Sequence, residues 1–113
     1  MPSKTGEENI RYLLGLTPKQ FEMFINLNEM NEQDLSSREI QGITGLDASV
    51  ITRTLAVLLK QGLVHREYAL RENAPPHYRY KTVNKEDFET KMLLAVEEFT
   101  SKVNKALGGL HFD

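Results

Sequence analysis

Residues 36–64, which read SSREIQGITGLDASVITRTLAVLLKQGLV, contain the signals that decide the fold. Ser36 and Glu39 have the spacing of a capping box, which predicts the start of a helix of about two turns. Asp47 is expected to cap a second helix, with its carboxylate near the unpaired N–H groups and the positive end of the helix dipole. Gly62 is expected to end that helix in the left-handed conformation. The stretch therefore predicts two consecutive helices.

The two helices are expected to meet at a sharp turn and to share one apolar core. Thr44 and Gly45 end the first helix, whose Ile40 and Ile43 are expected to face inward. On the second helix, apolar residues recur at steps of three and four, which is typical of one buried face. This buried stripe consists of Ile51, Leu55, Leu58 and Leu59. The pattern predicts a helix-turn-helix.

A β-hairpin is expected directly after the second helix, with strands over residues 63–70 and 77–83. The segment 71–76 is expected to lie outside the sheet, because Pro75 and Pro76 lack the N–H groups that a ladder needs. The second strand alternates, so that its aromatic face is expected to pack on the domain and its basic face to look outward. The aromatic face holds Tyr78, Tyr80 and Thr82, and the basic face holds His77, Arg79 and Lys81.

A helix-turn-helix followed by such a hairpin is built to lay its second helix in the major groove of DNA and the hairpin, or wing, on the backbone. Double-stranded DNA is therefore the expected partner. Arg53 is the side chain able to grip a guanine through two hydrogen bonds, whereas basic residues of the wing would contact phosphate or the minor groove. The predicted DNA contacts are Ser37, Arg38, Ala48, Ser49, Thr52, Arg53, Lys60, Arg66, Arg71, Arg79 and Lys81.

Two further helices are expected before this stretch. Residues 9–15 carry apolar side chains at helical spacing, and Gly15 ends this short helix. Thr17 is expected to cap the next helix, with Pro18 at its first position, where the missing N–H does no harm. This helix is expected to end between Met30 and Asp34. Its expected buried residues are Phe21, Phe24 and Ile25.

A long helix is expected from its cap at Asn84 to about Leu107, since no glycine or proline interrupts it. Its apolar residues recur at steps of four and three, as in a coiled-coil seam. A helix about 35 Å long, at 1.5 Å per residue, exceeds what a small domain covers, so the stripe is expected to meet a second copy of the chain. The predicted dimerisation residues are Phe88, Met92, Ala95, Val96, Phe99, Val103 and Leu107.

The composition of the 113-residue chain sets further limits. We expect a mainly α protein with a small β-hairpin (α+β). Residues 1–83 would form the winged helix-turn-helix DNA-binding domain, and residues 84–113 the C-terminal dimerisation helix and tail of the same structural unit. No apolar run has the length of a membrane span and no secretory signal is visible, so a cytoplasmic protein without a membrane partner is expected. The net charge is −2, but residues 44–82 hold six Lys/Arg against three Asp/Glu, which favours nucleic acid locally.

Metal binding and catalysis are disfavoured by the sequence. The chain has no cysteine, and a site built on histidine would need a specified set of ligands. His65 and His77 could face each other across the hairpin, but no third ligand is spaced with them, and His111 lies in the tail. No nucleophile has a recognisable base, and no glycine-rich phosphate loop exists. We therefore expect no cofactor and no enzyme activity.

Six short pieces of the chain carry a resemblance to a known family. They are LTPK (16–19), LSSREI (35–40), GLD (45–47), RTL (53–55), LLKQGLV (58–64) and YRY (78–80). Through them, residues 10–107 resemble the winged helix-turn-helix transcriptional regulators of the TrmB/MarR-like group, in particular small archaeal-type members with one winged domain and a C-terminal dimerisation helix. The resemblance implies a homodimer that regulates transcription by sequence-specific binding to an inverted-repeat operator. It leaves any small-molecule effector unknown, and the sugar-binding domain of larger TrmB-type regulators is not expected.

The chain departs from this group at the start of the second helix, where Asp47 and Ala48 replace the usual Ser and basic residue. An acid at this position weakens the attraction to phosphate. Together with the acidic total charge, it favours an alternative function, a winged-helix protein-interaction adaptor of the transcription machinery without specific DNA binding. The Pro75-Pro76 pair also resembles the wing of Z-DNA-binding domains, but Thr52 and Ala56 stand where those domains present Asn and Tyr.

Overall fold

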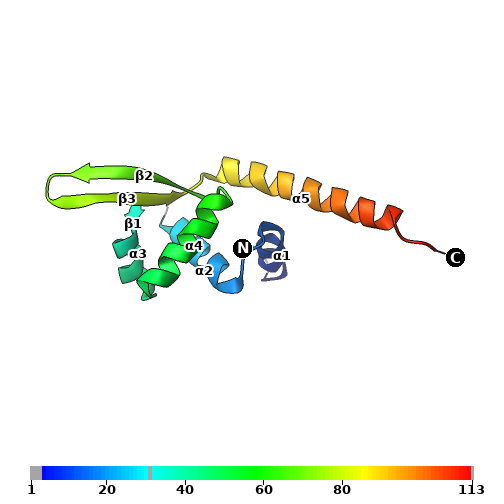
Figure 1. Ribbon diagram of the computed structural model, residues 1–113, viewed down its shortest axis with the longest axis horizontal. Coiled ribbons are helices and arrows are strands. Elements are labelled where there is room, and N and C mark those ends of the chain that lie inside the picture. Colours follow the sequence, from blue (N-terminus) through cyan, green and yellow to red (C-terminus); the bar gives the residue numbers. More distant parts are fainter. Residues whose placement is uncertain (1–3, 31, 113) are drawn as a thin grey trace. The chain divides into compact units, whose positions relative to one another are not determined.

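The computed structural model describes residues 4–30 and 32–112, and Figure 1 shows its helices and strands. In chain order they are α1 (Lys4–Leu14), α2 (Pro18–Glu29), β1 (Leu35–Ser36), α3 (Ser37–Thr44), α4 (Ala48–Lys60), β2 (Val64–Arg71), β3 (Ala74–Thr82) and α5 (Lys85–Gly108). They form two compact units, one of residues 18–84 and the other of the residues up to 17 together with those from 85 onward. The mainly helical architecture with one small sheet confirms the predicted fold class.

The helix-turn-helix is formed by α3 and α4. The predicted capping box is present, since the backbone N–H of Glu39 donates to Ser36 Oγ over 3.1 Å and the backbone N–H of Ser36 donates to Glu39 Oε1 over 3.4 Å. Gly45 ends α3 with a φ of 71°, a conformation in which a side chain is strained. Between α3 and α4 the chain bends by 114°, which lies within the range of helix-turn-helix motifs.

The two ends of α4 follow the prediction to different degrees. Asp47 holds the N-cap position, but its side chain makes no capping hydrogen bond, so the predicted role of the carboxylate is wrong. Asp47 is exposed, and water can solvate both the carboxylate and the N–H groups at this end. At the other end Gly62 has a φ of 71°, and the N–H of Leu63 donates to the carbonyl of Leu58 over 2.9 Å. These features belong to a Schellman motif and confirm the left-handed cap.

The core of the unit 18–84 is contributed by α2, α3, α4 and the sheet. Its buried residues are Met23, Phe24, Leu27, Leu35, Ile40, Ile51, Thr54, Leu55, Leu58, Leu63, Val64 and Thr82. On α2 the buried face runs through residues 23, 24 and 27, so Phe21 and Ile25 lie half-buried at its borders, contrary to the prediction. Ile43 was also expected inside but is 48% exposed, because Ile40 fills the inward position of this short helix. Leu59 is likewise only half-buried.

The sheet has the strand order β1-β3-β2, and both pairings are antiparallel. β1 contributes only two pairs to β3, Leu35 with Tyr80 and Ser36 with Arg79. From residue 78 back to residue 74, β3 pairs with β2 alone. The hairpin is therefore a two-stranded ribbon over its outer part.

The prediction that Pro75 and Pro76 lie outside the sheet is wrong, because β3 already begins at Ala74. Ala69 pairs with His77 and Arg71 pairs with Ala74, so Leu70 stands opposite both prolines at an irregularity of the register. A bulge of this kind leaves positions without ladder bonds, and the far side of β3 is an edge here. The missing N–H groups of the prolines therefore cost little.

In the other unit α1 packs on α5. α1 begins at Lys4, earlier than the predicted residue 9, and ends before Gly15 as expected. α5 covers nearly its predicted range, and none of its residues is buried. The first helix therefore groups with the long helix and not with the rest of the predicted domain 1–83.

No single helix in the described part of the chain is long and apolar enough to cross a membrane, and α3 with α4 reach that composition only when they are joined across their bend. The end of α2 lies close to its predicted position. The helix ends at Glu29, one residue before the range from Met30 to Asp34 in which its end was predicted, and Asn31 within that range lies outside the described residues.

Candidate nucleic-acid interface

The outer face of α4 is small, polar and open to solvent. Ala48, Ser49, Thr52 and Arg53 are all exposed. Thr52 Oγ1 donates to the carbonyl of Ala48 over 2.9 Å, and Arg53 Nε donates to the carbonyl of Ser49 over 3.3 Å. Because the Arg53 bond uses Nε, the two Nη groups keep donors for the forked pair of bonds that guanine accepts. This face can therefore approach a base pair closely.

Other predicted contacts of the same unit are also accessible. Ser37 and Arg38 are exposed in the first turn of α3, and Lys60 is exposed at the end of α4. On the hairpin, Arg66 and Arg71 are exposed, whereas Lys81 is half-buried.

The hairpin carries an aromatic cluster that faces solvent. Tyr68 and Tyr78 are 59% and 42% exposed, and Leu70 beside them is 76% exposed. The prediction that the aromatic face packs on the domain therefore holds only at the base of the strand, where Tyr80 is half-buried and Thr82 is buried. Beyond Arg79, β3 pairs with β2 alone, and none of the residues 65–78 is buried, so nothing in the described chain packs on this outer part of the aromatic face.

Arg79 departs most clearly from its predicted role. Its side chain is only 10% exposed, and its guanidinium forms ion pairs with Asp34 Oδ1 over 2.8 Å and with Glu39 Oε1 over 2.9 Å. The prediction that Arg79 faces outward was wrong, because these two carboxylates hold it against the start of α3. Asp34 was not among the predicted site residues. The two partners are 45 residues apart in the chain, and no local pattern joins them.

The ionisation of this cluster reflects the same contacts. The hydrogen bond from Arg79 is the main reason why the pKa of the Asp34 carboxyl is lowered, although burial acts in the opposite direction. Burial would raise the pKa of Glu39, but hydrogen bonds from the Ser36 backbone and from Arg79 outweigh it, and this pKa is also lowered. The bond to Asp34, with a further contribution from Glu39, raises the pKa of Arg79. All three groups are charged at neutral pH.

The histidines do not form a metal site in the described residues. His65 pairs with Lys81, and His77 pairs with Ala69. The two rings therefore do not face each other across the hairpin, contrary to the arrangement that the sequence allowed. Their strand positions differ by four residues, or roughly 13 Å at the rise of a β-strand. No group of three or more His, Cys, Asp or Glu side chains able to hold a metal ion occurs among residues 4–30 and 32–112.

The apolar stripe of α5 lies in the other unit and is largely open. Val96, Phe99, Val103 and Leu107 are between 40% and 51% exposed. Phe88, Met92 and Ala95 are half-buried.

A capped helix, a sharp bend, a second helix with an open polar face and a following hairpin together define a winged helix-turn-helix protein. A family model described as MarR family matches residues 14–70, which is just over half of the chain. The chain therefore belongs to the MarR family. The MarR part of the predicted resemblance is thereby confirmed, and the TrmB part stays a prediction.

Solved structures share this fold. A possible transcriptional regulator from Methanosarcina mazei Go1 is 15% identical, with a TM-score of 0.81 over 95% of this chain and 90% of that chain. A protein of the thermoacidophilic archaeon Sulfolobus tokodaii is 18% identical, with a TM-score of 0.71 over 91% of this chain and 99% of that chain. MepR of S. aureus, solved as a DNA complex, is 14% identical, with a TM-score of 0.58 over 92% and 88% of the two chains. No curated protein matches the sequence. The family is one of regulators and not of enzymes, as expected.

Proposed function

We propose that this protein is a transcriptional regulator that binds double-stranded DNA sequence-specifically as a homodimer. The observation that carries the proposal is the open face of α4, with small residues at positions 48 and 49 and a single forked donor at Arg53. This face follows a bend of 114° in a chain of the MarR family. In a helix-turn-helix, the second helix enters the major groove with such a face toward the base edges.

The DNA-binding surface proposed here is the predicted set without Arg79. α4 supplies Ala48, Ser49, Thr52 and Arg53 for the bases, and positioning on the backbone falls to the other contacts. These are Ser37, Arg38, Lys60, Arg66, Arg71 and Lys81. The S. aureus relative MepR has been solved in complex with DNA, which supports the proposal through the shared fold.

Dimerisation is proposed to use the stripe of α5. Four of its apolar side chains are at least 40% exposed, and an apolar seam of this spacing is normally covered by a partner helix. A symmetric dimer presents two copies of α4. Its operator should therefore be an inverted repeat whose half-sites lie about 34–36 Å apart, which is one turn of DNA.

The experiment that tests this function is a footprint of the purified protein on the DNA upstream of its own gene. A protected inverted repeat, competed weakly by scrambled DNA, is the expected result. Absence of binding at low salt would contradict the proposal. The exposed Asp47 carboxylate, which caps nothing, then favours the adaptor function, because an acid at this end of α4 suits a basic protein partner better than phosphate.

A further inference from the structure

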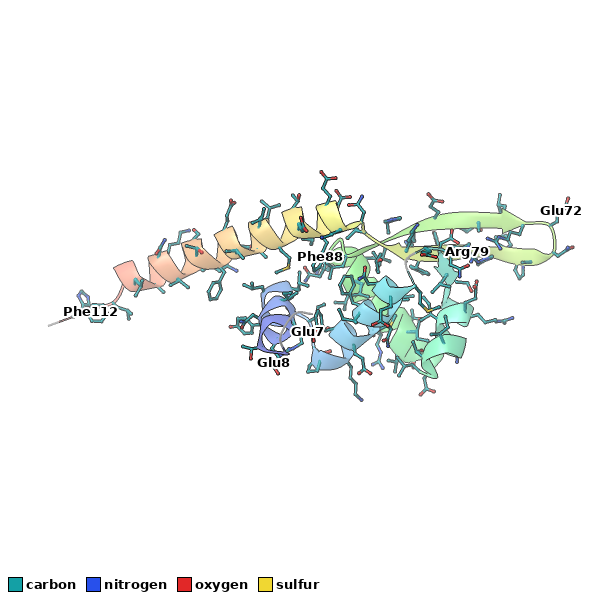
Figure 2. All side chains as sticks on the ribbon, turned by 180° about the vertical axis from the view of Figure 1, so that it is seen from behind. Glu7, Glu8, Glu72, Arg79, Phe88 and Phe112 are labelled. Atoms are coloured by element: carbon teal, nitrogen blue, oxygen red, sulfur yellow. The ribbon has the colours of Figure 1, made fainter. Side chains whose placement is uncertain are left out.

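Arg79 lies where the hairpin leaves the rest of its unit. It pairs with Ser36 in the last pair between β1 and β3, and beyond it β3 pairs with β2 alone. Figure 2 shows Arg79 at the base of this ribbon and Glu72 at its tip. A two-stranded ribbon is only marginally stable by itself. The direction in which the wing points therefore depends on the contacts at its base.

The guanidinium of Arg79 is held by several bonds at once. Nε donates to Asp34 Oδ1 over 2.8 Å, and Nη2 donates to the Asp34 carbonyl oxygen over 2.9 Å. Nη1 lies 2.9 Å from Glu39 Oε1 and 3.4 Å from His77 Nε2. This arrangement uses the planar fork of arginine, which the single ammonium group of lysine cannot reproduce.

Glu39 joins this cluster to the helix-turn-helix. Its Oε1 accepts a hydrogen bond from the backbone N–H of Ser36, as part of the capping box, and also meets Arg79. One carboxylate therefore links the start of α3, where Ser37 and Arg38 lie, to the strand that carries Lys81. Two groups of proposed DNA contacts are fixed relative to each other through it.

We propose that Arg79 is a positioning residue, which holds the wing against the start of α3 so that the wing and α4 meet one DNA duplex together. It does not itself bind phosphate, because a phosphate would have to displace two carboxylates from a side chain that is 10% exposed. The inference rests on the proposed DNA binding. Without Arg79, the wing would have to be ordered during binding, and that cost lowers affinity.

The first test distinguishes the effect of the planar guanidinium geometry from the effect of its positive charge. Arg79→Lys and Arg79→Gln are titrated with salt on a mixed-sequence duplex, beside Arg71→Lys and Arg71→Gln as matched controls on the exposed wing. Arg79→Lys should weaken binding nearly as much as Arg79→Gln, by on the order of tenfold, as loss of preorganisation predicts. The salt dependence should stay unchanged for both Arg79 variants. Arg71→Lys keeps the positive charge and should therefore keep the wild-type salt slope, whereas Arg71→Gln should lower that slope by about one counterion.

If Arg79→Lys binds like the wild type and Arg79→Gln lowers the slope by about one, Arg79 is a phosphate contact and the proposal is overturned.

A second test removes negative charges, whereas the first test changes positive ones. Asp34→Ala and Glu32→Ala each remove one negative charge, and Glu32 is exposed two residues before Asp34. Simple attraction to DNA predicts that both variants bind more tightly. The positioning role predicts that Asp34→Ala weakens binding and Glu32→Ala does not. Equal tightening in both variants would overturn it.

A third measurement needs no DNA. Hydrogen exchange of the backbone amides of residues 65–71 and 77–80 should be faster in Arg79→Lys than in the wild type, while the amides of α4 stay protected. Unchanged exchange in the wing would overturn the proposal. If the wild type binds no duplex at low salt, the proposed DNA-binding function fails, and this measurement still decides whether Arg79 holds the wing.

Discussion

The guanidinium of Arg66 lies over the ring of Tyr78, with its central carbon 4.1 Å from the ring centroid. The same ring meets Tyr68 edge-on, at 5.3 Å between centroids, and the two tyrosines are partners in the register of β2 and β3. These three side chains tie the two strands together where the hairpin extends beyond β1: Arg66 pairs with Tyr80, the partner of Leu35, and the Tyr68–Tyr78 pair lies outside the β1 pairing. They act there as a small substitute for a core.

Tyr78→Ser should loosen the outer hairpin and leave the rest of the unit folded. Loss of a cross-strand pair costs about 0.2–1 kcal/mol, and an exposed cation–π contact contributes about 0.5–1 kcal/mol more. Hydrogen exchange of residues 65–71 should rise, with little change in the thermal midpoint. Tyr12→Ser, at a tyrosine of α1 that is 68% exposed, is the control. Unfolding of the whole unit by Tyr78→Ser would show that the cluster does more than we infer.

Arg53 and Lys81 should affect DNA binding in different ways. Arg53→Ala should relax the preference for one base and cost about 1–3 kcal/mol on the matched site. Lys81→Ala should weaken matched and scrambled DNA alike and reduce the salt slope by about one counterion. Salt titrations of both variants on both duplexes check this. The reverse pattern would mean that the wing reads sequence and α4 does not.

Phe99→Glu combined with Val103→Glu should convert the protein to a monomer, because two carboxylates in the apolar stripe would be buried without partners at the interface. Leu94→Glu is the matched control. Leu94 is 60% exposed on α5, but by helical spacing it lies away from the stripe. Light scattering at roughly tens of micromolar gives the mass of each variant. A wild type that is monomeric under these conditions would refute dimerisation.

The ion pairs of Arg79 should make the unit less stable in acid. The pKa values of Asp34 and Glu39 are lowered in the folded chain, so their contribution is fully present at neutral pH. It is lost as the pH falls below their ordinary values of 3.8 and 4.5. The difference in unfolding free energy between the wild type and Arg79→Gln should therefore shrink from about pH 6 to about pH 3. Chemical denaturation across this range measures it, and a constant difference would contradict the assignment.

Two glycines of the helix-turn-helix should respond to alanine in opposite directions. Gly45 has a φ of 71°, so Gly45→Ala should destabilise the protein by about 1–2 kcal/mol. Gly42 lies within α3, and an added Cβ there meets nothing within 4 Å. Gly42→Ala should therefore stabilise by about 0.5–1 kcal/mol, since alanine is the better helix former. Thermal unfolding of both variants compares them, and a stabilising Gly45→Ala would be inconsistent with the left-handed cap.

Much of the fold could be predicted because its signals are local. The capping box of Ser36 and Glu39, the end of α3 at Gly45 and the cap at Gly62 each depend on residues within one or two turns. The buried stripe of α4 could be predicted from the spacing of its apolar residues alone, without knowledge of the elements that pack on it. These features locate the candidate DNA-reading face.

The features that the sequence did not predict depend on contacts between residues that are far apart in the chain. The environment of Arg79 depends on Asp34, which comes next to it only through the pairing of β1 with β3. Pro75 and Pro76 fit into β3 because an irregularity of the register places Leu70 opposite both of them. Strand propensities of single residues do not predict such an irregularity. The grouping of α1 with α5 joins the first and last helices of the chain. No spacing within either segment indicates that contact.

The distribution of tyrosines gives the protein a built-in optical reporter. The chain has no tryptophan and four tyrosines, of which Tyr68, Tyr78 and Tyr80 lie on the hairpin. Ultraviolet emission is therefore not masked by indole and comes mostly from one motif. Replacing Tyr12 by Phe would confine it there entirely, so that quenching, anisotropy and lifetime could follow the hairpin without any attached dye.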